Sequence, residues 1–113
     1  MDLNLNQIPF DELIKPVDGN VGRGTIEERF TRFHAANPHV YEALRQIALW
    51  CHRNGKRMGI KAIYERARWE FSVRTDGKPY RLDNNFTALY SRMIMENEPA
   101  LAGFFETRQR RAA

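Results

Sequence analysis

Apolar side chains recur with a helical period from residue 25 onward, and the first such stretch begins at a clear start signal. Thr25 and Glu28 have the spacing of a capping box, in which each side chain accepts a hydrogen bond from the other residue's backbone amide. The apolar face that follows consists of Ile26, Phe30 and Phe33. Because these positions are four and three residues apart, the pattern predicts a helix that ends near Ala36.

A second helix is predicted directly after the first. Asn37 is a favourable N-cap residue and Pro38 a favourable first helical residue, so the chain restarts there as a helix. Its predicted inward face consists of Val40, Leu44, Ile47 and Cys51. Asn54 and Gly55 supply the left-handed exit that ends many helices, which predicts a stop at about Asn54.

A third helix is predicted over residues 60–70. Its apolar sector contains Ile60, Ile63, Tyr64, Ala67 and Phe71. The opposing polar strip contains Lys61, Glu65 and Arg68. Trp69 falls in a third strip with Ala62 and Arg66, away from the apolar sector. We expect its indole to pack against another element rather than to lie at a binding surface.

The period changes after the third helix, and residues 71–82 have the pattern of a β-hairpin. Asp76 and Gly77 form a dipeptide that strongly favours a two-residue hairpin turn. With this turn, the register places four apolar side chains on one face of the ribbon: Phe71, Val73, Tyr80 and Leu82. A slip of one residue would scramble this sorting, so the pattern predicts the register as well as the hairpin.

Two further helical segments are predicted towards the C-terminus. Asp83, Asn84 and Asn85 offer caps for a fourth helix. Its amphipathic stripe consists of Phe86, Leu89, Tyr90, Met93 and Ile94. Pro99 then starts a short fifth helix, which carries Leu101, Phe104 and Phe105. Residues 1–24 show no sustained period, so we predict an irregular arm with one short helical turn there.

This order of elements is that of a winged helix: three helices, a two-stranded wing, and one or two C-terminal helices. We therefore predict a mainly α fold with one β-hairpin, resembling a winged helix. The predicted organisation is an irregular N-terminal arm over residues 1–24, one domain over 25–107 and a basic tail over 108–113. A length of 113 residues with 42% hydrophobic residues is sufficient for one domain with a core.

Basic residues are concentrated in the middle of the chain. The sequence carries 18 Lys and Arg against 14 Asp and Glu, a formal charge of +4 at pH 7. Residues 37–83 hold ten of the basic residues but only five of the acidic ones. Such a cluster is typical of a protein that binds a polyanion, and equally of a solvated basic face without a partner. The sequence leaves both interpretations open.

In the winged-helix interpretation the partner is double-stranded DNA. The third helix would enter the major groove, and the wing would lie on the backbone. The predicted contacts are Lys56, Arg57, Lys61, Arg66 and Arg68 from the third helix and its connection, and Arg74, Lys78 and Arg81 from the wing. Since Lys61 is the only polar side chain in the first turn of that helix, we expect phosphate contacts to outweigh base readout.

Several short motifs are shared with a known group of sequences. They are Phe33-His34 with Asn37-Pro38, Ile63-Tyr64-Glu65-Arg66 with Arg68-Trp69, the turn from Leu82 to Asn85, and Pro99 with Phe104-Phe105. In these motifs, over about residues 30–111, the chain resembles small uncharacterised proteins of temperate phages and prophages. The resemblance implies a bacterial or phage cytoplasmic setting and a role in phage gene control or host interaction. It implies no catalytic residues.

Candidate catalytic and metal-binding side chains are few. Cys51 is the single cysteine, so this sequence holds no internal disulfide and no multi-cysteine zinc site, and we expect it to be a core residue. His34 and His39 flank a helix break without the spacing of a metal site. We expect His34 to act as a cap or as a satisfied interior group. We predict no metal, no cofactor and no enzymatic activity.

The function expected from the sequence is therefore DNA binding by a phage- or prophage-derived regulator. The alternative is a protein-interaction module that binds a bacterial host protein, with the acidic, partly apolar arm at residues 1–24 ordering on binding. Apolar runs are too short to span a membrane and the N-terminus lacks the pattern of a secretory signal, so we expect a soluble cytoplasmic protein. Whether two copies associate stays open.

Overall fold

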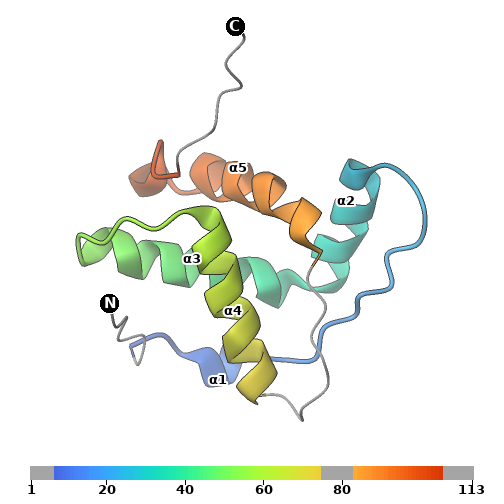
Figure 1. Cartoon of the computed structure of the whole chain (residues 1–113), viewed down its shortest axis with the longest axis horizontal. Helices are drawn as coiled ribbons and strands as arrows, with labels where there is room; N and C mark the ends of the chain where they lie inside the picture. The colour runs from blue at the N-terminus through green and yellow to red at the C-terminus, as the bar shows by residue number, and fades with distance from the viewer. Residues whose placement is uncertain (1–6, 75–82, 106–113) are drawn as a thin grey trace, which may run out of the picture.

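The fold is built from helices throughout the part of the chain that the structure describes. The structure is a computed structural model that describes residues 7–74 and 83–105, and within these ranges there is no β-strand. The elements in chain order are α1 (Phe10–Leu13), α2 (Ile26–Ala36), α3 (Pro38–Arg53), α4 (Ile60–Arg74), the 3-10 turn η1 (Asn84–Phe86), α5 (Thr87–Asn97) and the 3-10 turn η2 (Pro99–Leu101). Figure 1 shows α3 running through the middle of the molecule, with α4 crossing it.

The predicted hairpin is wrong, because the residues assigned to its first strand continue α4. Phe71 to Arg74 are helical, and α4 ends at Arg74 rather than near residue 70. Phe71 is fully buried, but Val73 is 55% exposed, so the two do not share a face as strand neighbours would. Phe71 lies four residues after Ala67 and extends the buried stripe of the helix. The predicted turn and second strand, residues 75–82, lie outside the described residues.

Because that strand is absent from the described residues, the winged-helix assignment is also wrong. A wing needs two paired strands, but the residues predicted for the first strand form the last turn of α4. This turn carries an ion pair between Glu70 and Arg74, which are four residues apart. Such a pair stabilises a helix and could not form along an extended strand. The fold class is therefore a small helical domain in the described ranges, and the element order that suggested a winged helix is incorrect.

The predicted bounds of α2 and α3 are confirmed to within a residue. The Thr25 amide donates to Glu28 Oε1 at 2.8 Å and the Glu28 amide donates to Thr25 Oγ1 at 3.1 Å, which is the predicted capping box. The second predicted helix begins at Pro38 and ends at Arg53. Gly55 follows with a φ of 66°, the left-handed conformation that glycine adopts without steric cost.

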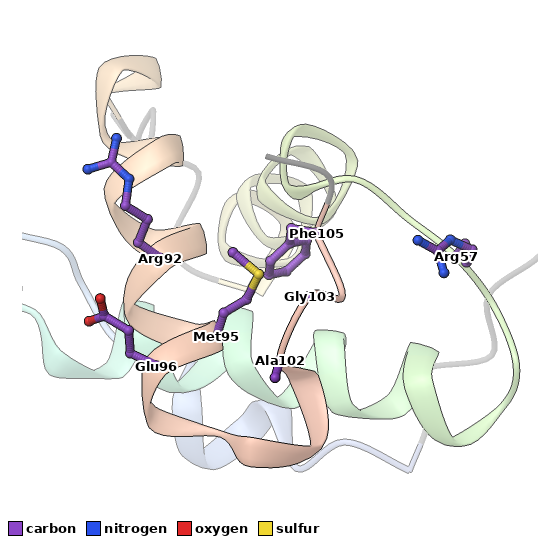
Figure 2. A pocket seen from close by; sticks show the side chains of 7 residues that line it. All are labelled: Arg57, Arg92, Met95, Glu96, Ala102, Gly103 and Phe105. Carbon is purple, nitrogen blue, oxygen red and sulfur yellow. The ribbon is translucent and has the colours of Figure 1, made fainter. Parts of the chain in front are cut away.

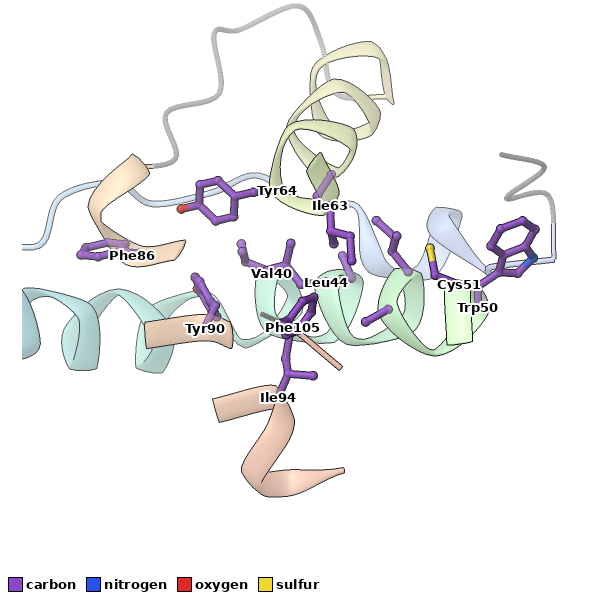
Figure 3. Packing of buried hydrophobic residues seen from close by; sticks show 14 of the residues in the cluster. Val40, Leu44, Trp50, Cys51, Ile63, Tyr64, Phe86, Tyr90, Ile94 and Phe105 are labelled. Carbon is purple, nitrogen blue, oxygen red and sulfur yellow. The ribbon is translucent and has the colours of Figure 1, made fainter. Parts of the chain in front are cut away.

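The core gathers around α3, and most of the predicted inward faces are confirmed. Figure 3 shows Val40 and Leu44 of α3 between side chains of α4 and α5, including Ile63, Tyr90 and Ile94. All of the residues predicted to face inward from α3 are buried, and so are most of those predicted on α4 and α5. Four residues that were predicted to face inward are only half-buried: Ile60, Leu89, Met93 and Phe104. In the first turn of α2, Ile26 is 38% exposed and stands outside the core.

The segment before α2 is packed onto the domain rather than extended away from it. Ile8 and Phe10 are 5% and 2% exposed and belong to the core, and α1 contacts α3. Further along, the amide of Asp18 donates to Asn37 Oδ1 at 2.8 Å, and Asn37 Nδ2 donates to the Asp18 carbonyl at 2.8 Å. The Asn37 side chain therefore ties this segment to the corner between α2 and α3 and does not cap α3.

Candidate functional site

Two of the arginines predicted to contact DNA are held by a buried carboxylate. Arg66 Nε lies 3.2 Å from Glu70 Oε2, and Arg74 Nε lies 2.8 Å from Glu70 Oε1. Glu70 is only 3% exposed, so its charge is compensated within the protein rather than by water. Arg74 also reaches Asp11 at 2.9 Å and lies over the Phe10 ring at 5.4 Å. These contacts make Arg74 a link between α1 and α4.

Arg68 is also engaged within the domain. Its guanidinium pairs with Glu65 one turn earlier, donates to Asn84 Oδ1 at 2.6 Å, and lies 5.7 Å from the centre of the Tyr64 ring. Tyr64 in turn donates to the Asp83 carbonyl at 2.8 Å. This set of contacts joins α4 to the start of η1, so Arg68 has a structural role on the side of α4 that faces the rest of the domain.

The remaining predicted contacts in the described ranges lie together at the connection between α3 and α4. We call this cluster the basic turn; it consists of Arg53, Lys56, Arg57 and Lys61, of which Arg53 was not predicted. No aspartate or glutamate occurs in residues 52–64. Lys56 is half-buried and the other three are exposed, and none of the four forms an ion pair within residues 7–74 and 83–105.

The backbone of the basic turn connects the last turn of α3 to the first turn of α4. The Lys56 amide donates to the Cys51 carbonyl at 2.8 Å, which closes the exit from α3 around the left-handed Gly55. α4 then begins at Ile60, and its first amides add the partial positive charge of a helix N-terminus to the side-chain charges. The basic turn therefore concentrates positive charge that no ion pair among the described residues neutralises.

A pocket of about 590 Å³ opens beside the basic turn. Figure 2 shows Arg57 on one side of it and Arg92 of α5 on the other, with Met95 and Phe105 between them. Arg92 was not predicted, because it is a single cation on the polar face of α5 and no charge pattern in the sequence marks it. The pocket thus adds a second cationic side chain to the surface around Arg57, with Glu96 as its acidic lining residue.

Trp69 is on the surface, and the expectation that it packs into the core is wrong. Trp69 is 56% exposed, and the Arg66 guanidinium lies 5.5 Å from the centre of its ring. Within the described part of the chain no other ring or cation packs against the indole. The spacing already placed Trp69 away from the apolar sector of α4. Its exposure agrees with that position, since no element in residues 7–74 and 83–105 packs a ring or cation from elsewhere against it.

The two remaining predicted contacts, Lys78 and Arg81, lie outside the described residues. The eight predicted cations therefore divide into three sets. Lys56, Arg57 and Lys61 share the basic turn, whereas Arg66, Arg68 and Arg74 form ion pairs further along α4. The latter three do not join the basic turn in one array of free cations.

His34 and His39 are half-buried, whereas His52 is exposed. His34 Nδ1 and His39 Nε2 are buried and have no hydrogen-bond partner among the residues described, so the expected satisfied or capping role of His34 is wrong. His34 instead packs between the rings of Phe30 and Tyr41. Cys51 is in the core, as predicted, and burial raises the pKa of its thiol. No group of three metal-binding side chains is present in residues 7–74 and 83–105.

Burial lowers the pKa of both His34 and His39 below the ordinary value of 6.5, although the backbone carbonyls of Pro16 and Lys15 partly oppose this for His39. The unfolded chain therefore binds more protons than the folded chain at mildly acidic pH. We expect the free energy of unfolding to fall as the pH drops from about 7 through 6.5 towards the lowered pKa values.

Urea unfolding at a series of pH values measures this slope. The His34→Phe variant keeps a ring against Phe30 but cannot take up a proton, so its unfolding free energy should fall less steeply on the acid side than that of the wild type. An identical slope in the variant and the wild type would show that His34 does not contribute.

Comparisons with known proteins add no relative. No protein-family model, no curated protein and no solved structure matches the chain. The resemblance to phage proteins therefore stays an expectation from the sequence motifs. None of the described helices combines the length and the apolar character that crossing a membrane requires.

Proposed function

We propose that the protein binds nucleic acid through its sugar-phosphate backbone, with the basic turn as the principal phosphate contact. The observation that supports this most is the run of basic residues from the end of α3 to the first turn of α4, without an ion pair among the described residues: Arg53, Lys56, Arg57 and Lys61. Cations that are already paired with carboxylates gain little from a phosphate, because the existing pair has to be broken. Within the described ranges, the cations of the basic turn have no such pair to break.

The chemistry of the turn suits a polyanion. Phosphate contacts are made by lysine and arginine side chains and by backbone amides at helix N-termini, and the basic turn provides both. Arg92, across the pocket from Arg57, extends the cationic surface to α5. Contacts of this kind position a nucleic acid without reading its sequence, which agrees with the shortage of base-reading side chains at the start of α4.

The alternative function, host-protein binding through residues 1–24, has less support. That hypothesis requires the arm to be available for a partner. Ile8 and Phe10 are instead buried in the core, and Asn37 holds the Asp18 backbone through two hydrogen bonds. A partner that took up the described part of this segment would have to displace those contacts.

Binding to a fluorescently labelled oligonucleotide at several salt concentrations tests the proposal. Each lost phosphate contact reduces the slope of log affinity against log salt by about 0.7 to 0.9. The double variant Lys56→Ala with Arg57→Ala should therefore bind more weakly, and its salt slope should be smaller by about 1.4 to 1.8.

The matched control is Lys15→Ala with Arg23→Ala, which removes the same charge from exposed side chains in the segment before α2. It should bind as the wild type does apart from a small general charge effect. If both double variants lose affinity equally, the basic turn has no special role; if the wild type does not bind at low salt, the protein does not bind nucleic acid.

A further inference from the structure

We propose that the nucleic acid is single-stranded and that one of its bases stacks on the indole of Trp69. This inference rests on the proposed function and names its substrate class. It is carried by an exposed aromatic side chain on α4, the helix that also carries Lys61 of the basic turn in its first turn. Aromatic platforms flanked by cations are the usual means by which proteins bind unpaired nucleotides without sequence preference.

The surroundings of Trp69 suit a stacking platform. Trp69 is 56% exposed, although tryptophan has the largest apolar side chain. Contact with a ligand would therefore remove a large apolar area from water. Arg66 lies 5.5 Å from the ring centre, and Glu70 holds the Arg66 guanidinium at 3.2 Å. Because Glu70 is itself buried and also bonded to Arg74, the arginine that supports the indole is anchored to the domain.

Trp69 is placed to continue the path of a strand that starts at the basic turn. Lys61 and Trp69 are eight residues apart in α4, which corresponds to about 12 Å along the helix and about 80° around it. At about 3.4 Å per stacked nucleotide this distance spans roughly three or four nucleotides. Ala62, next to Lys61 and about 20° around the helix from Trp69, is exposed and small enough to let a chain pass.

The acidic residue on this route does not oppose a polyanion strongly. Glu65 is exposed between Lys61 and Trp69, but its carboxylate is paired with Arg68. The charge along the route is therefore positive at the basic turn and close to neutral next to Trp69. A strand would meet phosphate contacts first and a base contact afterwards.

Single strands fit this surface better than duplexes or proteins do. Bases in a duplex are covered on both faces by their neighbours, so an indole can stack on one only after it is unpaired. A protein partner would account for Trp69 and Val73 but not for the basic turn, whose cations form no ion pair among the described residues. Charge complementarity along α4 favours the single strand.

The two tryptophans allow a direct test. Trp50 is 5% exposed and Trp69 is 56% exposed, so in the Trp50→Phe variant the indole emission comes from Trp69 alone. Titration with oligothymidylate of about 12 nucleotides should quench this emission as the strand binds. Should Trp50→Phe fail to fold, the wild type serves instead: bound oligothymidylate should protect Trp69 from quenching by acrylamide.

Affinity measurements complete the test. Trp69→Ala should weaken binding of labelled oligothymidylate roughly fivefold to a hundredfold while leaving the salt slope unchanged, because no charge is removed. The control is Val73→Ala, which shortens the other exposed apolar side chain of α4 and should bind as the wild type does.

Each failure has a distinct meaning. Binding without a change in Trp69 emission, with Trp69→Ala at full affinity, would overturn the stacking but leave phosphate binding intact. Tighter binding to a duplex of the same length would overturn the single-strand assignment. No binding of any oligonucleotide would overturn the proposed function itself.

Discussion

Replacing Ser72 by proline is expected to destabilise the folded chain by about 3 kcal/mol, because residue 72 lies inside the last turns of α4. A proline there removes the amide that would bond to the carbonyl of residue 68, and its ring collides with that carbonyl. Ser72 is exposed, so no loss of core packing contributes to the effect. Urea unfolding followed by circular dichroism measures the change.

The matched variant is Ser72→Ala, which keeps the amide and has a high helix propensity. It should be as stable as the wild type or slightly more stable. An edge strand of a hairpin, in contrast, tolerates proline where its amide faces solvent. If Ser72→Pro and Ser72→Ala were equally stable, residues 71–74 would not be helical and the correction of the hairpin would itself be wrong.

Truncating Phe10 to alanine is expected to destabilise the chain by about 3 to 5 kcal/mol, the usual cost of removing a buried phenylalanine side chain. Phe10 is 2% exposed, and its ring also receives the Arg74 guanidinium at 5.4 Å. The loss should appear as a lower midpoint of urea unfolding with an unchanged slope, because the rest of the core still unfolds as one unit.

Glu12→Ala provides the control, since Glu12 belongs to the same short helix but is exposed. Its effect should stay within about 0.5 kcal/mol. A free arm would make both substitutions neutral. A neutral result for Phe10→Ala would therefore show that the segment before α2 is not part of the folded domain, and it would restore the hypothesis that this segment binds a partner.

The helices could be predicted where local signals and periodicity agree. The Thr25 capping box, Pro38 at a first helical position and Gly55 at a helix exit are each local features of the backbone, and all three were identified correctly. The buried face of α3 followed from its period because α3 lies at the centre of the domain and is covered by other helices. Local sequence is a sufficient guide in such segments.

The end of α4 could not be predicted because two periods fit the same residues. Phe71 continues the helical stripe from Ala67, but with Val73 it also fits a strand that leads into Asp76-Gly77. The contacts that favour the helix come from elsewhere in the chain: Arg74 bonds Glu70 and also Asp11, which is 63 residues away in sequence. Tertiary contacts of this kind override a local turn signal.

The sequence could show where cations are concentrated but not which of them have partners. Composition showed that the cations gather in the middle of the chain, and Lys56, Arg57 and Lys61 do share the basic turn. Charge counts could not reveal that Arg66 and Arg74 flank a buried Glu70, since burial depends on how α4 packs. The position of Arg92 across the pocket likewise depends on how α5 folds back beside the turn.

The central claim is that a nucleic acid contacts the basic turn and continues along α4 to Trp69. Two-dimensional amide spectra of the labelled protein, recorded while oligothymidylate is added, test it most directly. We predict that the amide signals of residues 53–61 and the indole signal of Trp69 move together, while the indole signal of the buried Trp50 does not. Shifts confined to other surfaces, such as residues 15–23, or the absence of any shift at low salt, would contradict the claim.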